Sequence, residues 1–532
     1  MKKRMCIWLA SILLLVLAAV PVTAEARSGR IGDLYWTFED GADGCFLTFE
    51  GTGAIPPVET PWFSDNADPY IVTNIIFGEG VTRIGRGCMP SMHSLTGVEF
   101  SSTIEEVGAN NFMNCDNLEG IVLPEGLQVL GENCFSGCEK LEWAVLPSTL
   151  QTIGDGCLTR CTALVELGVA EENPVFALED GLLINRQDGK VMAAITGSER
   201  TECTVPDTVT AAGDYAFAGW SALEQASLPE RFRHISRGMF ENCTGLKNVD
   251  LPKKLLDIDA GAFAGCSALK EIAIPNHLRS ISADAFEKTT AFRCAEGSYA
   301  DFHARRYGLE AHHTGERLVC AEGSLPDAAL LSPTVALKQG SGLQADQCWL
   351  KFYELEDRRS TRRIAYDVDL LDRYGKSVST DAPIQLILPY PEGLGWETAG
   401  GYQIKVIHEG KDGTEQFSTA EGSLECLKQG LSLNVTHFSP FEITWSEAVE
   451  SPEATATPEP TAAPEATATP EPTAAPEATA TPEPTAAPEA TAAPEPTTRP
   501  PQTGDGGRPS LYLLLLLGSA AALLLLRKAR KA

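Results

Sequence analysis

Four kinds of side chain recur along this chain with a step of 23 residues, and this repeat constrains the fold more than any other feature. Each unit opens on a hydrophobic residue and places a large apolar side chain five residues later, as at Ile258 and Phe263. A small residue, usually cysteine, and then a leucine follow, as at Cys266 and Leu269. The openings are Ile84, Val107, Leu130, Ile153, Ala212, Ile235, Ile258 and Ile281. This self-similarity predicts a solenoid, because each unit can bury its apolar face only by stacking on its neighbours.

The recurring slots predict which side chains form the core. The large apolar slot holds Met89, Phe112, Phe135, Leu158, Phe217, Phe240, Phe263 and Phe286. Arg279 lies between the slots, so we expect it to tolerate alanine. Most cysteines also share fixed slots, where they are expected to act as small buried hydrophobes; Cys348 and Cys426 lie outside the slots and are candidates for a disulfide bridge.

The period is interrupted once, and the chain on either side of the repeats has a different pattern. From Ile153 to Ala212 the step is 59 residues, which places an insertion near residues 170–205. Apolar runs within the insertion predict a β-hairpin that keeps the stack continuous. Alternating apolar residues separated by Asp and Gly predict an N-terminal β cap over 32–81, ahead of a solenoid over 82–310.

The units resemble BspA-type leucine-rich repeats over residues 32 to 310. The resemblance rests on a set of slots that recur together, as in Ile258-Asp259, Ala262-Phe263, Cys266, Leu269 and Ile274-Pro275. It implies a bacterial surface protein that binds host or neighbouring-cell molecules. It implies no catalytic residues.

Beyond the repeats the composition changes twice. Residues 315–446 contain strand-like runs separated by Gly and Pro turns, which predict an Ig-like β-sandwich. Residues 451–499 repeat Pro, Glu, Ala and Thr and hold too few apolar side chains for a core, so we expect a disordered stalk. The predicted fold class is therefore mainly β with short helices: a leucine-rich repeat solenoid of 23-residue units, a β-sandwich, the stalk and a C-terminal hydrophobic helix.

Both ends of the chain carry export signals. Residues 1–24 combine a basic start, an apolar run and small residues, as a cleaved signal peptide does. Residues 500–532 resemble the cell-wall sorting signal of Gram-positive surface proteins, with the motif Pro501, Gln502, Thr503 and Gly504, the hydrophobic segment 511–526 and a basic tail, although Pro500 stands where the family has leucine. The resemblance implies that a sortase cuts after Thr503 and joins it to peptidoglycan.

A second reading of the C-terminus is an unprocessed anchor. Residues 511–526 would span roughly 24 Å as a helix, short of the ~30 Å hydrocarbon core of a bilayer. A segment of this length suits a transient stop during export. We therefore expect an exported protein on the cell wall or cell surface, held in the membrane by 511–526 if it is not processed.

Composition and motifs disfavour several other functions. The formal net charge of −30 would repel nucleic acid. The chain has no Gly-rich phosphate loop and no nucleophile elbow. The tandem His312-His313 is the only histidine pair at metal-binding spacing, and we interpret it as a solvated linker. We expect no enzyme, no cofactor and no metal site.

The outward slots of the predicted strands point to a binding face. Most of these slots hold polar or small residues, but Val122, Trp143 and Val145 are apolar. An exposed aromatic flanked by valines is typical of a surface that anchors a partner. Alternatively, the insertion or the β-sandwich folds over this patch. We therefore predict an adhesion protein that contacts host or bacterial surface macromolecules, and the alternative is a structural spacer with no specific ligand.

Overall fold

The computed structural model describes residues 27–41, 44–57, 62, 71–410 and 413–448, which belong to one compact unit. The predicted signal peptide 1–24, the stalk 451–499 and the sorting signal 500–532, with Pro501 to Gly504 and the segment 511–526, lie outside the described residues. Within the described part of the chain, no helix is both long enough and apolar enough to cross a membrane.

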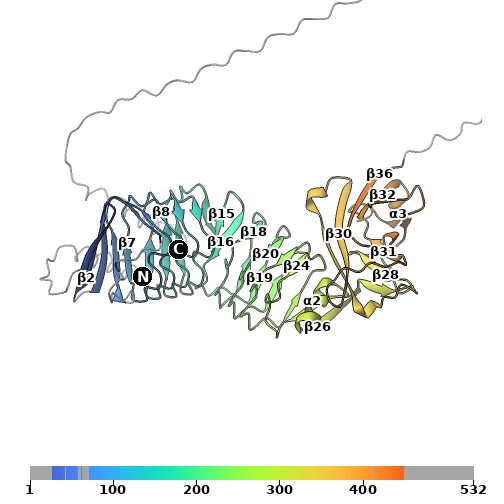
Figure 1. Ribbon diagram of the computed structural model, residues 1–532, viewed down its shortest axis with the longest axis horizontal. Coiled ribbons are helices and arrows are strands. Elements are labelled where there is room, and N and C mark those ends of the chain that lie inside the picture. Colours follow the sequence, from blue (N-terminus) through green and yellow to red (C-terminus); the bar gives the residue numbers. More distant parts are fainter. Residues whose placement is uncertain (1–26, 42–43, 58–61, 63–70, 411–412, 449–532) are drawn as a thin grey trace, which may run out of the picture. The chain divides into compact units, whose positions relative to one another are not determined.

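Successive coils of the solenoid contribute strands to two parallel ladders on opposite sides of the core (Figure 1). Ahead of the insertion, the first ladder consists of two sheets: β5 (Asn74–Phe77) pairs with β7 (Gly97–Glu99), and β9 (Gly120–Val122), β11 (Trp143–Leu146) and β13 (Glu166–Val169) pair in the next. The second comprises β4 (Gly53–Ile55), β6 (Val81–Ile84), β8 (Glu106–Val107), β10 (Val129–Leu130) and β12 (Thr152–Ile153). From β5 and β6 onward, residues on paired strands are 23 apart, as for Leu130 with Ile153, so the sequence period is the length of one coil. The first pair, β4 with β6, spans a longer coil, as Ile55 with Ile84 shows.

The same arrangement resumes after the insertion. One side carries β17 (Glu202–Thr204), β19 (Gln225–Ser227), β21 (Asn248–Asp250), β23 (Glu271–Ala273) and β25 (Ala291–Glu296). The other carries β18 (Ala211–Ala212), β20 (His234–Ile235), β22 (Asp257–Ile258) and β24 (Ser280–Ile281). Helix α2 (Tyr299–Tyr307) and strand β26 (Ala311–Arg317) follow β25. The helix starts at Ser298, whose side chain accepts a hydrogen bond from the Asp301 amide, and ends at the left-handed Gly308.

An antiparallel ribbon covers the N-terminal end of the stack. Strands β1 (Arg27–Ile31), β2 (Leu34–Gly41) and β3 (Gly44–Gly51) pair in that order, and β3 then pairs in parallel with β5. The predicted cap over 32–81 extended too far, because β4 and β5 within that range already belong to the two ladders. These first coils lack the recurring side chains that mark later units, so the period did not reveal them.

The insertion forms a three-stranded antiparallel sheet, here called the hairpin wall, that separates the N-terminal half of the solenoid core from the C-terminal half. Strands β14 (Phe176–Glu179), β15 (Leu182–Asn185) and β16 (Lys190–Ala194) pair antiparallel, and β16 continues in parallel onto β18. Side chains alternate across a strand. Leu183 and Met192 accordingly pack into the N-terminal core, whereas Leu182 and Val191 pack into the C-terminal core. The hairpin thus replaces a coil and is apolar on both faces.

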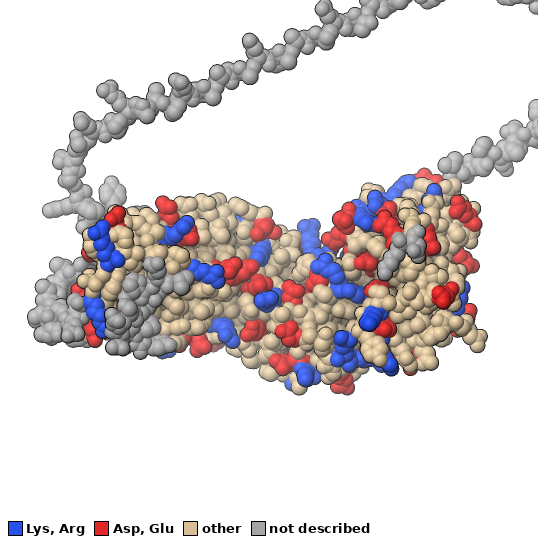
Figure 2. Space-filling view, viewed as in Figure 1, with Lys and Arg blue, Asp and Glu red and all other residues tan. Residues whose placement is uncertain are grey.

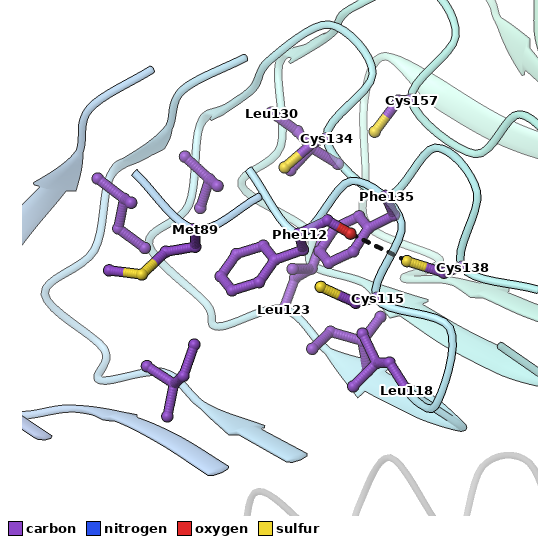
Figure 3. Close-up of a cluster of buried hydrophobic side chains, with 14 of the residues drawn as sticks. Met89, Phe112, Cys115, Leu118, Leu123, Leu130, Cys134, Phe135, Cys138 and Cys157 are labelled. Atoms are coloured by element: carbon purple, nitrogen blue, oxygen red, sulfur yellow. Dashed lines mark hydrogen bonds between the residues drawn. The ribbon is translucent and has the colours of Figure 1, made fainter. Parts of the chain in front are cut away.

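The large apolar slot forms a stack of rings inside the solenoid. Phe112 and Phe135 stack with ring centroids 5.5 Å apart, and Phe217, Phe240, Phe263 and Phe286 form a second stack at 5.2, 5.4 and 4.9 Å. Figure 3 shows Phe112 and Phe135 among the buried side chains of neighbouring coils.

The cysteine slot adds a repeated hydrogen bond to this core. The Cys138 thiol donates to the Phe112 carbonyl at 3.1 Å (Figure 3), and Cys266 donates in the same way to the Phe240 carbonyl. A small, weakly donating, apolar side chain therefore suits this position better than serine or alanine.

The candidate bridge between Cys348 and Cys426 is not formed, because every cysteine in the described residues is free. Cys348 lies on β29 (Cys348–Glu354) and Cys426 on β34 (Glu425–Cys426), which belong to different sheets. The spacing of the two cysteines along the chain could not show whether their strands belong to the same sheet.

After β26 the chain forms two sheets that share one core. In the described residues, one sheet has the order β27 (Val319–Ala321), β28 (Thr334–Leu337), β31 (Ile384–Leu388), β35 (Leu431–Val435) and β34 (Glu425–Cys426). The other has the order β29 (Cys348–Glu354), β30 (Arg363–Asp372), β36 (Pro440–Glu447), β32 (Tyr402–Gly410) and β33 (Gly413–Ser418). Short helices are η3 (Ala345–Gln347), η4 (Glu356–Arg358) and α3 (Trp396–Ala399). All neighbouring strands pair antiparallel except β27 with β28.

Candidate functional site

The apolar residues on the outward side of β9 and β11 lie next to one another. Val122 pairs with Val145 in the parallel register, and Trp143 pairs with Gly120 on one side and Glu166 on the other. Their chain neighbours Ile121, Leu123, Ala144 and Leu146 are buried in the core. Strand alternation therefore turns the side chains of Val122, Trp143 and Val145, here called the apolar patch, away from the core.

The indole of Trp143 packs against Gly120 on the neighbouring strand. A Cβ atom built on Gly120 would lie 2.0 Å from Cε2 of Trp143, so a glycine is required beneath the ring. This contact half-buries Trp143, and Val145 is half-buried as well. Val122 remains 45% exposed, so neither the insertion nor the β-sandwich covers its side chain. The apolar patch combines one accessible valine with an aromatic ring that is fixed by its own sheet.

Acidic residues border the apolar patch. Glu119 and Glu142 are exposed and immediately precede β9 and β11, and the Glu142 amide donates to the Glu119 carbonyl, so the two residues lie side by side. Glu166 begins β13 beside Trp143. The resulting surface has an apolar centre with carboxylates at its edge.

Equivalent outward slots after the insertion are polar. Gln225, Asn248 and Asp250 are exposed, and the Ser227 hydroxyl donates to the Asp250 carboxylate at 2.9 Å. Figure 2 shows Lys, Arg, Asp and Glu side chains interspersed on the viewed face of the molecule. The apolar patch therefore belongs to the first half of the solenoid only.

A second feature is the contact between the last coils and the β-sandwich. The backbone amide of Glu354 on β29 donates to Nε2 of His277 at 2.6 Å, and Lys254 forms an ion pair with the Glu354 carboxylate at 2.6 Å. Burial lowers the pKa of His277 from 6.5 to about 4, so this ring accepts the hydrogen bond as a neutral imidazole. Beside it lies a hollow of about 720 Å³ with basic and acidic residues in its lining. A mixed-charge lining differs from the mostly apolar lining of a typical small-molecule pocket.

The histidines differ from the sequence-based interpretation. His312 and His313 lie within strand β26, not in a linker, and pair with Glu271 and Asp301 respectively. The sequence-based interpretation missed this strand because a helix separates it from β25, so the repeat period does not continue into it. A different group, His408, Glu415 and His437, brings one possible ligand atom from each residue within 4.8 Å of the others. His408 and Glu415 face each other across the hairpin of β32 and β33, whereas His437 is distant in the sequence and meets them only because β36 also neighbours β32.

Comparison with known proteins bears on the repeats. Residues 68–176 and 194–295 match the family model described as BspA type leucine rich repeat region, in six copies. A comparison with curated proteins finds no match.

Several solved structures are similar to the chain. A leucine-rich repeat protein from Eubacterium ventriosum ATCC 27560 is 19% identical, with a TM-score of 0.33, over 49% of this chain and 93% of that one. A leucine rich cell surface protein from Faecalibacterium prausnitzii A2-165 is 17% identical, with a TM-score of 0.36, over 55% and 96%. The pneumococcal vaccine antigen PcpA is 16% identical, with a TM-score of 0.37, over 54% and 99%.

The family match and the coil length give the same assignment. The matched residues cover both halves of the solenoid, and the interruption in the match falls on the hairpin wall of β14 to β16. The solenoid therefore has a leucine-rich repeat fold, and residues 68–176 and 194–295 match the BspA-type repeat model.

Proposed function

We propose that this chain is a cell-surface adhesion protein whose solenoid binds a host or bacterial macromolecule through the apolar patch. The observation that carries the proposal is the juxtaposition of Val122, Trp143 and Val145 on adjacent strands, with the Trp143 ring held over Gly120. A rigid aromatic loses little conformational freedom on binding, and such residues dominate the energy of many interfaces.

The border of the patch indicates the chemistry of the partner. Glu119, Glu142 and Glu166 lie at the edge of the apolar centre, so a complementary surface carries an apolar centre with basic residues at the matching edge. Exposed charges at the rim mainly raise the association rate and make it sensitive to salt. A nucleic acid would be repelled by this border and by the net charge of −30.

Anchoring is the second part of the proposal. The sequence of Pro501, Gln502, Thr503 and Gly504 followed by the hydrophobic segment 511–526 supports covalent attachment of Thr503 to peptidoglycan by a sortase. The segment 511–526 would hold the chain in the membrane before processing. The protein would then be released from cells by muralytic enzymes and not by detergent. Full recovery of the intact chain in detergent, or an unchanged distribution of Thr503→Ala, would contradict attachment through Thr503.

Binding is tested with residues 25–448, which contain every core described above. We would measure retention on immobilised mucin, extracellular matrix proteins and intact cells of neighbouring bacteria. Trp143→Ala is expected to weaken binding by about 2 kcal/mol, the size expected for a hot-spot residue. Gln225→Ala, at the equivalent outward slot after the insertion, is the matched control.

The outcomes separate adhesion from the structural alternative. Loss of binding in Trp143→Ala with a retained melting temperature supports the apolar patch as the binding face. A lower melting temperature with unchanged binding would mean that Trp143 serves the fold and that the partner binds elsewhere. Uniform absence of binding to all three kinds of surface would favour a spacer without a specific ligand.

A further inference from the structure

Three neighbouring segments of one sandwich sheet converge on a small group of imidazole and carboxylate side chains. His408 lies on β32 and is directly opposite Glu415 on β33 in the antiparallel register. His437 lies just ahead of β36, the other neighbour of β32. The two imidazole rings have centroids 4.5 Å apart, and one ring nitrogen of each and a Glu415 carboxylate oxygen lie within 4.8 Å of one another.

Both imidazoles carry nitrogen atoms whose hydrogen-bonding capacity is unused. His408 is 0% exposed and stacks on Phe441 at 4.1 Å, and its Nδ1 lies 3.4 Å from Glu415. Nδ1 of His437 lies 3.3 Å from the Thr436 hydroxyl. Nε2 of each histidine is buried and has no hydrogen-bond partner among the described residues. Buried polar atoms normally have partners, so two such atoms in adjacent rings call for an explanation.

The chemistry of the group matches a late first-row metal ion. A neutral imidazole has a nitrogen lone pair to donate to a metal ion. Two histidines and one carboxylate form a set that binds Zn²⁺ and leaves one position open, whereas Mg²⁺ and Ca²⁺ prefer oxygen ligands alone. Ligand atoms around tetrahedral Zn²⁺ lie roughly 3.4 Å apart. Because Glu415 is exposed, its side chain is free to close the remaining distance.

We propose that His408, Glu415 and His437 form a binding site for a divalent transition-metal ion of the Zn²⁺ type in the β-sandwich. The ion would tie β32 and β33 to the segment that precedes β36. This site is independent of the apolar patch, which lies on the solenoid.

The test uses residues 25–448 without an affinity tag, stripped of metal and titrated with zinc sulfate. We expect saturable binding of one Zn²⁺ per chain by calorimetry and a melting temperature that rises with Zn²⁺ concentration. Magnesium chloride should give neither effect. Buried thiols do not compete in the folded protein, because burial raises the pKa of, for example, Cys157 to about 12.

The variants avoid the fully buried His408, whose replacement would disturb the core. Glu415→Gln and His437→Gln alter an exposed and a half-buried side chain, and each should weaken Zn²⁺ binding about tenfold or more while the metal-free protein keeps its melting temperature. Glu425→Gln on β34 is the matched acidic control, and His312→Gln tests the other cluster of histidine and carboxylates.

The site would be overturned by an absence of saturable Zn²⁺ binding, by unchanged affinity in both Glu415→Gln and His437→Gln, or by loss of binding in His312→Gln instead. Equal stabilisation by Mg²⁺ would also contradict it, because that result would indicate a non-selective acidic surface.

Discussion

Replacing Phe263 with alanine tests whether the solenoid is stabilised by stacking between neighbouring coils. Phe263 is 1% exposed and stacks on Phe240 at 5.4 Å and on Phe286 at 4.9 Å. Truncating a buried phenylalanine removes its apolar contacts and leaves a cavity, which costs about 3 to 5 kcal/mol in free energy of unfolding. Each aromatic pair accounts for about 0.5 to 1.5 kcal/mol beyond burial alone. We therefore expect Phe263→Ala to fall near the upper end of the range.

A double-mutant cycle isolates the stacking contribution. Phe240→Leu and Phe263→Leu, alone and together, should show a coupling energy of about 0.5 to 1.5 kcal/mol in urea unfolding of residues 25–448 followed by circular dichroism. Phe112→Leu with Phe263→Leu is the control, because Phe112 lies in the other core, beyond the hairpin wall. That pair should be additive within about 0.5 kcal/mol. Equal coupling in both cycles, or a cost below about 1 kcal/mol for Phe263→Ala, would refute the argument.

Three further predictions follow from other contacts. Arg279→Ala should lower the free energy of unfolding in urea by about 1 to 3 kcal/mol, because it removes a bidentate ion pair with the buried Asp257. Arg279→Lys should restore part of this stability. A change below about 0.5 kcal/mol in Arg279→Ala would contradict the prediction. The melting temperature should fall as pH drops from 6.5 towards 4, because the unfolded chain then binds protons that buried His277 and His303, each with a pKa lowered to about 4, do not bind in the folded chain. His277→Gln should remove part of this dependence, and an unchanged pH profile in this variant would contradict the assignment. When the native protein is alkylated and analysed by mass spectrometry, the half-buried Cys426 should be modified before any fully buried thiol. In urea, every cysteine should be modified. Early modification of a solenoid cysteine in the native protein would mean that its coil opens.

The 23-residue period was sufficient to predict the solenoid, because every coil must meet the same packing requirement. A large apolar side chain such as Phe240 and a small one such as Cys266 must recur at the same position if each coil is to pack on the next. The position of the insertion follows from the same period, since only an element apolar on both faces can interrupt the stack without exposing its core. The outward direction of Trp143 likewise follows from the alternation along a strand.

Contacts between residues far apart in the sequence were decided only by the tertiary structure. Arg279 lies between the recurring slots, and the sequence predicted that it would tolerate alanine; the fold instead places it against Asp257 of the preceding coil. The glycine at position 120 is explained by the Trp143 ring one coil later. His408 and His437 meet because β32 and β36 are neighbours, although 29 residues separate the two histidines in the chain. Hydrophobic periodicity reports which side of a strand is buried, but strand order in the sandwich depends on the packing of the whole domain, so pairings of this kind have no signature in a local pattern.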